Sequence, residues 1–385
     1  MTTAERINAW MLNEGRLLGD GICIVEHYAR LLRESGVPLQ RANIAQLLAN
    51  PLLAAWGVIW TSDETTQYDV ERSTLEMPAY IGGPFEYVLV NKTTLHKSLT
   101  DLNVEKEHGA YIDLAAAGGT DLYANLLEYG DGSIQGCTYV TDNQYGFSDE
   151  HISLIENTRH GLACALEPVA MRRSTESLLR TYIGNGPASA VVDGSIRRGE
   201  HTTIDAVVMF SDLRGFTEKT EKWAKSDLFE ALNSYFDAVV DAVEKSGGDV
   251  LKFMGDGILS VFPIKNQSTK STCEAAIDAA RTAISSMNTI NDERLKAGEQ
   301  PLSMGIGIHL GSVTYGNIGS PSRLDFTVVG SAVNIASRVQ DLCKRVGEPI
   351  LITSEIFKHQ SSGFVSQGAY NIRGVIKPIE VFAVE

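Results

Sequence analysis

The stretch LKFMGDGILSVF, residues 251–262, has the pattern of a tight hairpin, with two apolar runs that meet at Gly-Asp-Gly. Its arms are otherwise apolar, yet Lys252 lies on the first arm and Asp256 at the bend. Aspartate and glycine favour turns for backbone reasons, and a lysine on a strand is ordinarily solvated. If Lys252 and Asp256 belonged to one site they would pair; alternatively, Lys252 faces a different partner.

The segments on both sides of this hairpin predict an α+β domain. AVVMF (206–210) is a continuous apolar strand, and a helix that opens at Ser226 is closed by Gly247 and Gly248 of SGGDV. After the hairpin come a helix at 273–296 and strands at 304–310 and 325–330. The order β-α-β-β-α-β is the ferredoxin-like unit, an antiparallel sheet backed by helices with one free face.

Two aspartates stand at one end of this predicted sheet. Asp212 ends the first strand, and Asp256 lies at the bend of a hairpin that pairs beside it in this topology. Each aspartate alone is explained by turn preference. Two carboxylates on adjacent strands can share hard divalent cations, and Mg2+ bound in this way keeps positions open for substrate phosphates.

Two further segments carry residues suited to phosphate chemistry. The turn SDLRGFT (211–217) follows a strand and contains a glycine, so it can aim backbone amides at a phosphate. Asn334 and Arg338 lie four residues apart in the helix predicted for 331–346, so both project from one face. That face is either a solvated polar stripe or a substrate contact, because arginine suits charge that builds on a phosphate.

The first 150 residues predict a separate α/β module. Residues 4–33 have helical apolar spacing, and short strand-like runs follow from 56 to 147, including one with Asp-Gly between two apolar runs. The run IAQLLANPLLAAWGVIW (44–60) is interrupted by Asn50 and Pro51, so we expect a buried helix, a turn and a strand rather than a membrane span.

A helix is expected to connect the two parts. Ser148 followed by two acids predicts a helix start, and Pro168 must begin a new segment or kink the helix. Sparse heptad spacing allows either an amphipathic helix packed on its own domain or a short coiled coil that joins two subunits. Residues 184–200, rich in glycine, serine and charge, are expected to be a connector. The expected domains are therefore 1–150, a helix and linker at 151–200, and 201–385.

Composition narrows the class of protein. The chain has 385 residues and a net charge of −15, which argues against a nucleic-acid partner because phosphate binding requires a basic surface. The five cysteines have no CxxC spacing, and the N-terminus lacks the order of a signal peptide. We therefore expect a globular cytoplasmic protein without a membrane anchor.

Four motifs in order resemble the class III nucleotidyl cyclase catalytic domain of the bacterial adenylate cyclase type. They are FSDLRGFT (210–217), LKFMGDG (251–257), GIGIHLGSVTYGNIGS (305–320) and DFTVVGSAVNIASRV (325–339). Four motifs in register over roughly 180 residues are far more specific than any one of them. The resemblance implies a homodimer with catalytic sites at the subunit interface.

The resemblance assigns a role to each matching residue. Asp212 and Asp256 match the two metal-binding aspartates, to which Leu213 is added, and two Mg2+ or Mn2+ ions per site are implied. Lys252 and Thr327 match the pair that reads the purine, Asn334 the residue that orients the ribose, and Arg338 the arginine that stabilises the transition state. The remaining residues assigned to substrate binding are Phe210, Leu213, Gly215, Phe216 and Thr217. Each site would take its metal aspartates from one chain and the other four residues from its partner, so one hairpin would serve two sites.

This resemblance implies an adenylate cyclase that forms 3′,5′-cyclic AMP and pyrophosphate from ATP. Lys252 can donate to adenine N1, whereas guanine carries a hydrogen there, and guanylate cyclases of the family have an acid at this position. Two positions depart from the family pattern, Thr327 where many relatives have aspartate and Val375 where a phosphate-binding lysine is expected. Arg373, Lys377 or Arg323 could replace that lysine.

Other functions remain open at this stage. SGGDV (246–250) superficially resembles the diguanylate cyclase signature, but we interpret it as a helix C-cap because neither Glu nor Phe follows. His309 is expected to pack rather than to bind a metal. A diguanylate cyclase, a guanylate cyclase and a catalytically silent nucleotide-binding scaffold are the alternatives. The N-terminal part resembles a GAF or PAS-like sensor in its architecture alone, which implies regulation by an unidentified signal.

Overall fold

The computed structural model describes residues 1–264 and 267–385. The chain divides into two compact units, Met1–Leu178 (unit 1) and Leu179–Glu385 (unit 2). The long helix that follows residue 148 therefore lies mostly in unit 1 rather than in a separate connecting segment. Among the described residues, no helix is both long enough and apolar enough to cross a membrane.

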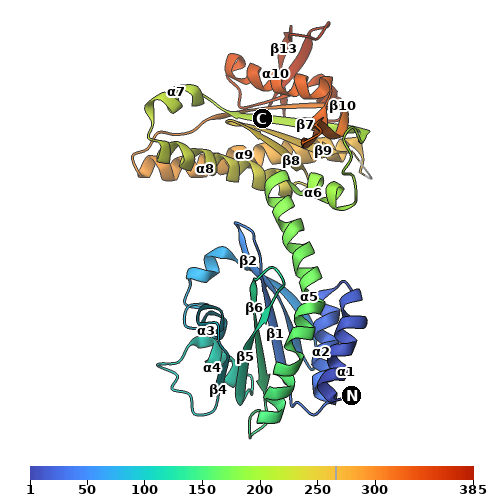
Figure 1. Ribbon diagram of the computed structural model, residues 1–385. Helices are drawn as coiled ribbons and strands as arrows, with labels where there is room; N and C mark the ends of the chain where they lie inside the picture. The colour runs from blue at the N-terminus through green and yellow to red at the C-terminus, as the bar shows by residue number, and fades with distance from the viewer. Residues whose placement is uncertain (265–266) are drawn as a thin grey trace. The chain divides into compact units, whose positions relative to one another are not determined.

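Unit 1 is a six-stranded antiparallel sheet with helices on both faces (Figure 1). The strand order is β3-β2-β1-β6-β5-β4. Its helices and strands are α1 (Thr3–Asn13), η1 (Gly15–Leu17), α2 (Gly21–Glu34), β1 (Arg41–Leu47), β2 (Leu53–Thr61), β3 (Thr65–Glu71), η2 (Arg72–Glu76), α3 (Pro84–Asn91), β4 (Leu95–Ser98), α4 (Gly109–Ala116), β5 (Asp121–Glu128), β6 (Ile134–Thr141) and the start of α5 (Asp149–Ile183). Helices α1, α2 and α5 cover one face, and α3 and α4 cover the other.

The expectation of a buried helix at the start of residues 44–60 is wrong. The segment forms β1 and β2, which pair antiparallel with Ile44 opposite Val58. The strand expected at the end of the segment is confirmed as β2, whereas its start forms β1, in which the consecutive residues Ala42, Asn43 and Ile44 are all buried, so both faces of the strand are covered. A continuous apolar run has no strand period, and periodicity therefore cannot distinguish it from a buried helix.

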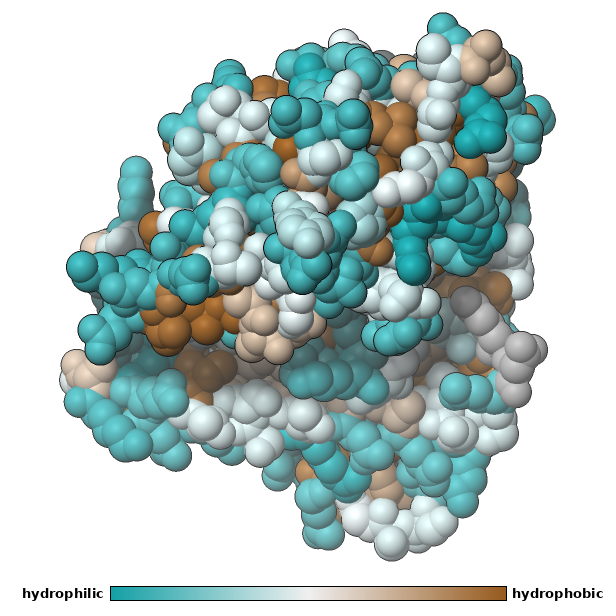
Figure 2. Space-filling view, turned by 90° about the horizontal axis from the view of Figure 1, so that it is seen from below, coloured by the Kyte–Doolittle hydropathy of each residue, from teal (hydrophilic) through white to brown (hydrophobic). Residues whose placement is uncertain are grey.

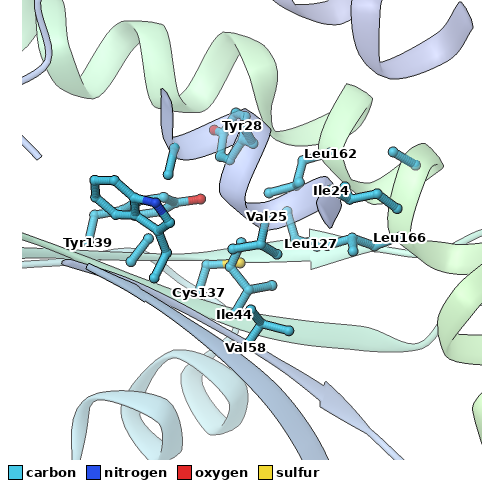
Figure 3. Close-up of a cluster of buried hydrophobic side chains, with 14 of the residues drawn as sticks. Ile24, Val25, Tyr28, Ile44, Val58, Leu127, Cys137, Tyr139, Leu162 and Leu166 are labelled. Carbon is cyan, nitrogen blue, oxygen red and sulfur yellow. The ribbon is translucent and has the colours of Figure 1, made fainter. Parts of the chain in front are cut away.

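The main core of unit 1 lies between the sheet and helices α1, α2 and α5 (Figure 3). Trp56, Tyr28 and Tyr139 are among its largest fully buried side chains. The Tyr28 hydroxyl lies 2.9 Å from the Thr158 hydroxyl and so joins α2 to α5 inside this core. The first part of α5 is thus packed within its own unit.

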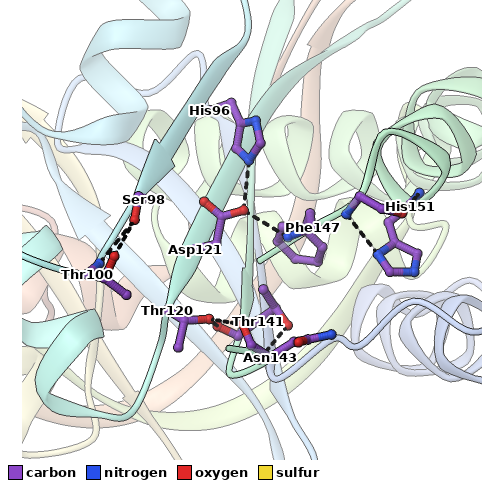
Figure 4. Close-up of polar contacts among 10 residues, drawn as sticks. His96, Ser98, Thr100, Thr120, Asp121, Thr141, Asn143, Phe147 and His151 are labelled. Carbon is purple, nitrogen blue, oxygen red and sulfur yellow. Dashed lines mark hydrogen bonds and ion pairs between the residues drawn. The ribbon is translucent and has the colours of Figure 1, made fainter. Parts of the chain in front are cut away.

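The start of α5 is fixed by two sets of polar contacts (Figure 4). The buried Asp121 carboxylate accepts from the Phe147 amide at 2.9 Å and contacts His96 Nε2 at 2.7 Å. Ser148 caps the helix, since its hydroxyl accepts from the His151 amide at 3.3 Å. The predicted helix start is confirmed, and the helix continues through Pro168 to Ile183 without a new segment.

Unit 2 contains an eight-stranded sheet in the order β13-β14-β12-β10-β7-β9-β8, with β11 paired to β10. Its elements are α6 (Asn185–Val192), β7 (His201–Leu213), α7 (Phe216–Lys222), α8 (Lys225–Lys245), β8 (Asp249–Met254), β9 (Gly257–Pro263), α9 (Thr269–Lys296), β10 (Met304–Ser320), β11 (Arg323–Val329), α10 (Ser331–Val346), β12 (Ile350–Thr353), α11 (Ser354–Phe357), β13 (Phe364–Tyr370) and β14 (Ile379–Val384). The order β10-β7-β9-β8 is that of the ferredoxin-like unit, so the predicted α+β class is confirmed.

Several local expectations need adjustment in unit 2. The connector at 184–200 contains helix α6, which packs on β8. The strand expected at 304–310 continues to Ser320 as β10. The expected C-cap is confirmed, because Gly247 has φ of 78° and its amide bonds to the Glu244 carbonyl.

Helices α8 and α9 cover one face of this sheet, and α10 lies on the other (Figure 1). The glycines of β10 allow α10 to approach closely. A Cβ atom at Gly307 would lie 2.5 Å from the Ala336 carbonyl oxygen, and one at Gly305 would lie 3.0 Å from Cys343 Cβ. The alternating glycines of GIGIHLG therefore face the helix that carries Asn334 and Arg338.

The surface of the protein is polar on the face drawn in Figure 2, where hydrophobic residues form separate patches among hydrophilic ones. Scattered apolar residues on a surface are normal. In unit 2, exposed apolar side chains include Met254 on β8 and Ile318, Leu324 and Val329 on β10 and β11.

Candidate active site

Asp212 and Asp256 lie side by side at one end of the sheet. Asp212 is the penultimate residue of β7 and pairs with Gly257, the first residue of β9. Asp256 immediately precedes that glycine, in the two-residue turn between β8 and β9, where Gly255 has φ of 67°. The register between β7 and β9 thus brings together the two acids that the sequence places 44 positions apart.

The contact between these carboxyl groups changes the acidity of Asp212. Burial, followed by the hydrogen bond and charge of Asp256 and the charge of Asp341, raises the pKa of Asp212 to about 7. Desolvation and a like charge both disfavour the ionised form of a carboxyl group. A cation placed between the two acids would remove the repulsion that causes part of this shift.

Residues that the sequence analysis did not single out hold this end of the sheet. The Ser211 hydroxyl lies 2.8 Å from the buried Tyr235 hydroxyl, so β7 is attached to α8 next to Asp212. Arg214 donates to the carbonyl oxygens of Cys343 and Glu348, at 3.2 and 2.6 Å, and so attaches the following turn to the end of α10. Asp341 on α10 adds a third negative charge near Asp212. These contacts join distant segments, and no local motif indicates them.

Lys252 and Asp256 face different partners. Lys252 forms an ion pair with Asp325 of β11, whereas Asp256 lies beside Asp212. A β-bulge between Val250 and Lys252 shifts the register of β8 against β9. The first alternative raised by the sequence, a Lys252–Asp256 pair, is therefore not formed.

Lys252 borders a cavity in unit 2 with a volume of about 530 Å3. Asp325, Phe326, Phe253 and Leu324 also line it. A cavity that combines aromatic and aliphatic walls with a few charged groups suits a planar ligand with polar edges. Thr327 lies two residues beyond Asp325 on the same face of β11 and is 7% exposed.

Asn334 and Arg338 lie on the outer side of α10. The helix buries Ala332, Ala336 and Val339 against the sheet, and Asn334 is exposed. Within residues 1–264 and 267–385, neither Asn334 nor Arg338 has a side-chain hydrogen bond or ion pair. Both side chains are therefore free to contact a group that does not belong to this chain.

The remaining residues assigned to substrate lie next to Asp212 in the chain. Phe210 and Leu213 are buried in β7, and Gly215 has φ of 72° in the turn before α7, which begins with Phe216 and Thr217. This conformation of Gly215 explains the glycine in SDLRGFT. The turn after Asp212 is therefore built on a left-handed residue.

The loop between β13 and β14 contains Val375, at the position where a phosphate-binding lysine was expected. Arg373 and Lys377 are exposed between β13 and β14, and Arg323 is exposed at the start of β11. Val375 packs partly against the cluster that contains Ile372. The structure therefore does not select one replacement among the three basic residues.

His309 is buried and bonds through Nδ1 to the Thr353 hydroxyl at 2.9 Å. Glu355 lies 3.8 Å from the same nitrogen, and burial lowers the pKa of the histidine despite this acid. The side chain thus has a polar partner inside the sheet.

Comparison with known proteins follows the same part of the chain. Residues 200–385 match the adenylate and guanylate cyclase catalytic domain family. An adenylate cyclase of Anabaena cylindrica is 34% identical over 191 residues, which are 49% of this chain and 36% of that protein. The adenylyl cyclase CyaB from P. aeruginosa is 29% identical with a TM-score of 0.45, covering 48% of this chain and 96% of that one. The guanylyl cyclase Cya2 is 30% identical with a TM-score of 0.43, covering 49% of this chain and 94% of that one.

Residues 200–385 belong to the class III nucleotidyl cyclase family. The family includes enzymes for both purines. The chain spans only about a third of the length of the Anabaena relative. The comparisons therefore define the class of catalytic domain and leave its nucleotide open.

The raised pKa of Asp212 predicts a pH-dependent effect of the substitution Asp256→Asn. Between the ordinary carboxyl pKa of 3.8 and about 7, the folded protein binds more protons than the unfolded chain, so stability falls as pH rises through this range. Asp256→Asn removes the charge next to Asp212 and should therefore reduce this loss of stability at high pH. In EDTA, the difference in Tm between variant and wild type should increase by about 2–4 °C from pH 5 to pH 8.

The matched control is Asp292→Asn, because Asp292 is exposed on α9. Its difference from wild type should stay constant with pH. If calorimetry gives the same difference in Tm between Asp256→Asn and the wild type at both pH values, the two carboxyl groups do not interact.

Proposed function

We propose that residues 200–385 convert ATP into 3′,5′-cyclic AMP and pyrophosphate at an interface between two copies of the chain. The observation that carries this proposal is the pair Asp212 and Asp256, two acids held together where their charges repel. Such an arrangement is unfavourable for the fold alone and suits a cation site. The reaction is an in-line attack of the ribose 3′-oxygen on the α-phosphorus, with pyrophosphate as leaving group.

The donor set fits divalent cations. Two carboxylates on rigid strand ends provide hard oxygen ligands, which Mg2+ and Mn2+ prefer. We propose that Asp212, Asp256 and the Leu213 backbone hold two such ions per site. When bound, the ions supply positive charge for the triphosphate and favour ionisation of the 3′-hydroxyl.

The base is proposed to lie beside Lys252 and Thr327. The Lys252 ammonium donates to adenine N1, which is an acceptor, and the Thr327 hydroxyl contacts the amino group. Asp325 fixes the lysine through their ion pair and partly balances its charge. The cavity beside the pair, with Phe253 and Phe326 in its walls, provides apolar surface for the ring.

Asn334 and Arg338 support the proposal of a shared site. Arg338 would stabilise the charge that develops on the α-phosphoryl oxygens, and Asn334 would orient the ribose. Neither has a partner within the described chain, and exposed apolar residues such as Ile318 and Val329 lie on neighbouring strands. A second copy that covers this surface would combine its Asp212 and Asp256 with these two side chains.

A guanylate cyclase is the second candidate. Asp325 places a carboxylate beside Lys252, and a carboxylate can accept from the N1 and amino hydrogens of guanine. A silent nucleotide-binding scaffold is disfavoured because Asp212, Asp256, Lys252, Asn334 and Arg338 are all present.

Unit 1 is proposed to regulate the cyclase as a sensor of the GAF or PAS-like kind. Its sheet has helices on both faces, and α5 leads from its core into Leu179, the first residue of unit 2. A ligand that alters the packing of α5 could change how two catalytic units meet.

The activity is tested by incubating the full chain with ATP or GTP and Mg2+ or Mn2+. Cyclic AMP should exceed cyclic GMP, and Asp212→Ala should reduce the rate at least a hundredfold because half of the metal-binding pair is lost. Asp292→Ala serves as the control and should retain the wild-type rate. Predominant cyclic GMP would select the second candidate, and no product under any condition would support the scaffold.

The shared site is tested by mixing two inactive variants, Asp212→Ala and Arg338→Ala. If each site combines residues from two chains, half of the dimers are mixed and one of their two sites is intact, so about a quarter of the wild-type rate returns. Cyclic AMP production after co-refolding measures this recovery. A mixture as inactive as its components would place all these residues in a site within one chain.

Regulation by unit 1 predicts that the cyclase rate changes when unit 1 is removed. Residues 179–385 should dimerise and turn over ATP at a rate that differs severalfold from that of the full chain, because the constraint through α5 is lost. Equal rates and equal dimerisation constants for the two chains would rule out this regulation.

A further inference from the structure

Unit 1 contains a cavity of about 240 Å3 on the sheet face opposite its main core. Arg41 and Asn43 of β1 line it, two residues apart and so on the same face of the strand. Thr138 of β6 lies directly opposite Asn43 in the sheet. Phe85 of α3 forms part of the wall and packs on Gly136, where a Cβ atom would lie 2.7 Å from the ring.

Arg41 carries an uncompensated charge. Throughout residues 1–264 and 267–385, its guanidinium has no hydrogen bond and no ion pair. Burial lowers the pKa of this arginine, which indicates that its positive charge is partly removed from water. A desolvated charge without a partner is unfavourable for the folded protein. The position therefore suits a ligand better than it suits the fold.

Asn43 lines the cavity, and its carbonyl oxygen has a partner on β3. The Tyr68 hydroxyl donates to Asn43 Oδ1 at 2.7 Å, which satisfies the carbonyl side of the amide. Tyr68 reaches across β2 because residue 57 is glycine, and a Cβ atom there would lie 2.4 Å from the tyrosine ring. Asn43 is only 7% exposed, and its amino group has no acceptor among the described residues.

A third donor completes the polar wall. Thr138 is 2% exposed, and its hydroxyl has no hydrogen-bond partner within the described chain. A guanidinium, an amide amino group and a hydroxyl thus belong to residues that line one cavity, and none of the three bonds to an acceptor among the described residues. Such a set of donors suits an oxyanion, and the planar fork of arginine suits a carboxylate.

We propose that this cavity binds a small monocarboxylate with a short apolar body. The carboxylate pairs with Arg41 and accepts from Asn43 and Thr138, and the apolar body contacts Phe85 and Leu114, which also line the cavity. The volume lies below the roughly 300 Å3 at which sites for drug-sized ligands begin, so the ligand is metabolite-sized.

Charge distinguishes a monocarboxylate from a phosphate. Arg41 is the one cation among the residues that line the cavity, and the exposed Asp113 also lines it. The other nearby acid, Glu86, already accepts from the Gly82 amide. A single negative charge matches Arg41, whereas a phosphate dianion would leave one charge uncompensated near Asp113.

This proposal rests on the sensor role proposed for unit 1 and adds a class of ligand to it. Because the test measures binding without nucleotide, a negative result would leave the cyclase proposal unaffected. Acetate, butyrate and hexanoate are titrated into the full chain by calorimetry, with butyramide and inorganic phosphate as matched probes. At least one monocarboxylate should saturate a single site per chain, and butyramide and phosphate should bind at least tenfold more weakly.

Variants of Arg41 separate binding from folding. Arg41→Gln should weaken carboxylate binding at least tenfold, and Arg41→Lys should weaken it less because the charge remains. Without ligand, Arg41→Gln should melt at the same temperature as the wild type or higher, since an unpaired buried charge is removed. Arg6→Gln, an exposed position on α1, is the control and should bind like the wild type.

Three results would overturn the proposal. They are equal affinity for butyramide and butyrate, unchanged carboxylate affinity in folded Arg41→Gln, and absence of binding by all three carboxylates up to about 10 mM, which is weaker than metabolite-binding sites ordinarily are.

Discussion

The fold of unit 2 holds two carboxyl groups that repel each other, Asp212 and Asp256, side by side at one end of its sheet. Asp212 and Asp256 are brought together by the register between β7 and β9, and burial together with the hydrogen bond and charge of Asp256 raises the pKa of Asp212 to about 7. The sheet bears this unfavourable contact because other interactions fix its end. The buried pair of hydroxyls on Ser211 and Tyr235 holds β7 on α8, and Arg214 attaches the next turn to the end of α10. The acids are thus positioned before any cation arrives, as electrostatic preorganisation requires.

The other residues assigned to the proposed chemistry lie on helix α10 and on strands β8 and β11 of the same unit. The glycines of β10 let α10 lie close to the strands, and this leaves Asn334 and Arg338 on the outer side of the helix. Lys252 shares the hairpin with Asp256 but pairs with Asp325. Within one chain, Asp256 thus lies beside Asp212 and Lys252 pairs with Asp325, while Asn334 and Arg338 have no partner among the described residues, as a site shared by two chains would require.

Unit 1 shows a related feature in a different setting. Its main core consists of large apolar side chains, and the hydroxyls of Tyr28 and Thr158 contact each other inside it. On the other face of the sheet, the Arg41 guanidinium and the Thr138 hydroxyl have no hydrogen-bond partner among the described residues. Natural proteins keep such unfavourable groups mainly where binding uses them. In both units, we propose a ligand for residues whose charge or unpaired donor is unfavourable for the folded chain.

The sequence by itself determined the class of the C-terminal domain and the positions of its proposed site residues. Ordered motifs identified Asp212 and Lys252, and alternation with turn residues predicted the hairpin between them, because local backbone preferences and short motifs are properties of neighbouring residues. The start of the segment at 44–60 was expected to be helical and forms β1, because a short strand that is buried on both faces shows no strict alternation. Only the tertiary structure decided that Lys252 pairs with Asp325 and that Tyr235 and Asp341 lie near Asp212. The absence of an ion-pair partner for Arg41 among the described residues also follows only from the structure. Those facts depend on contacts between residues distant in the chain, which the register of the strands and the packing of the helices fix and which no local pattern records.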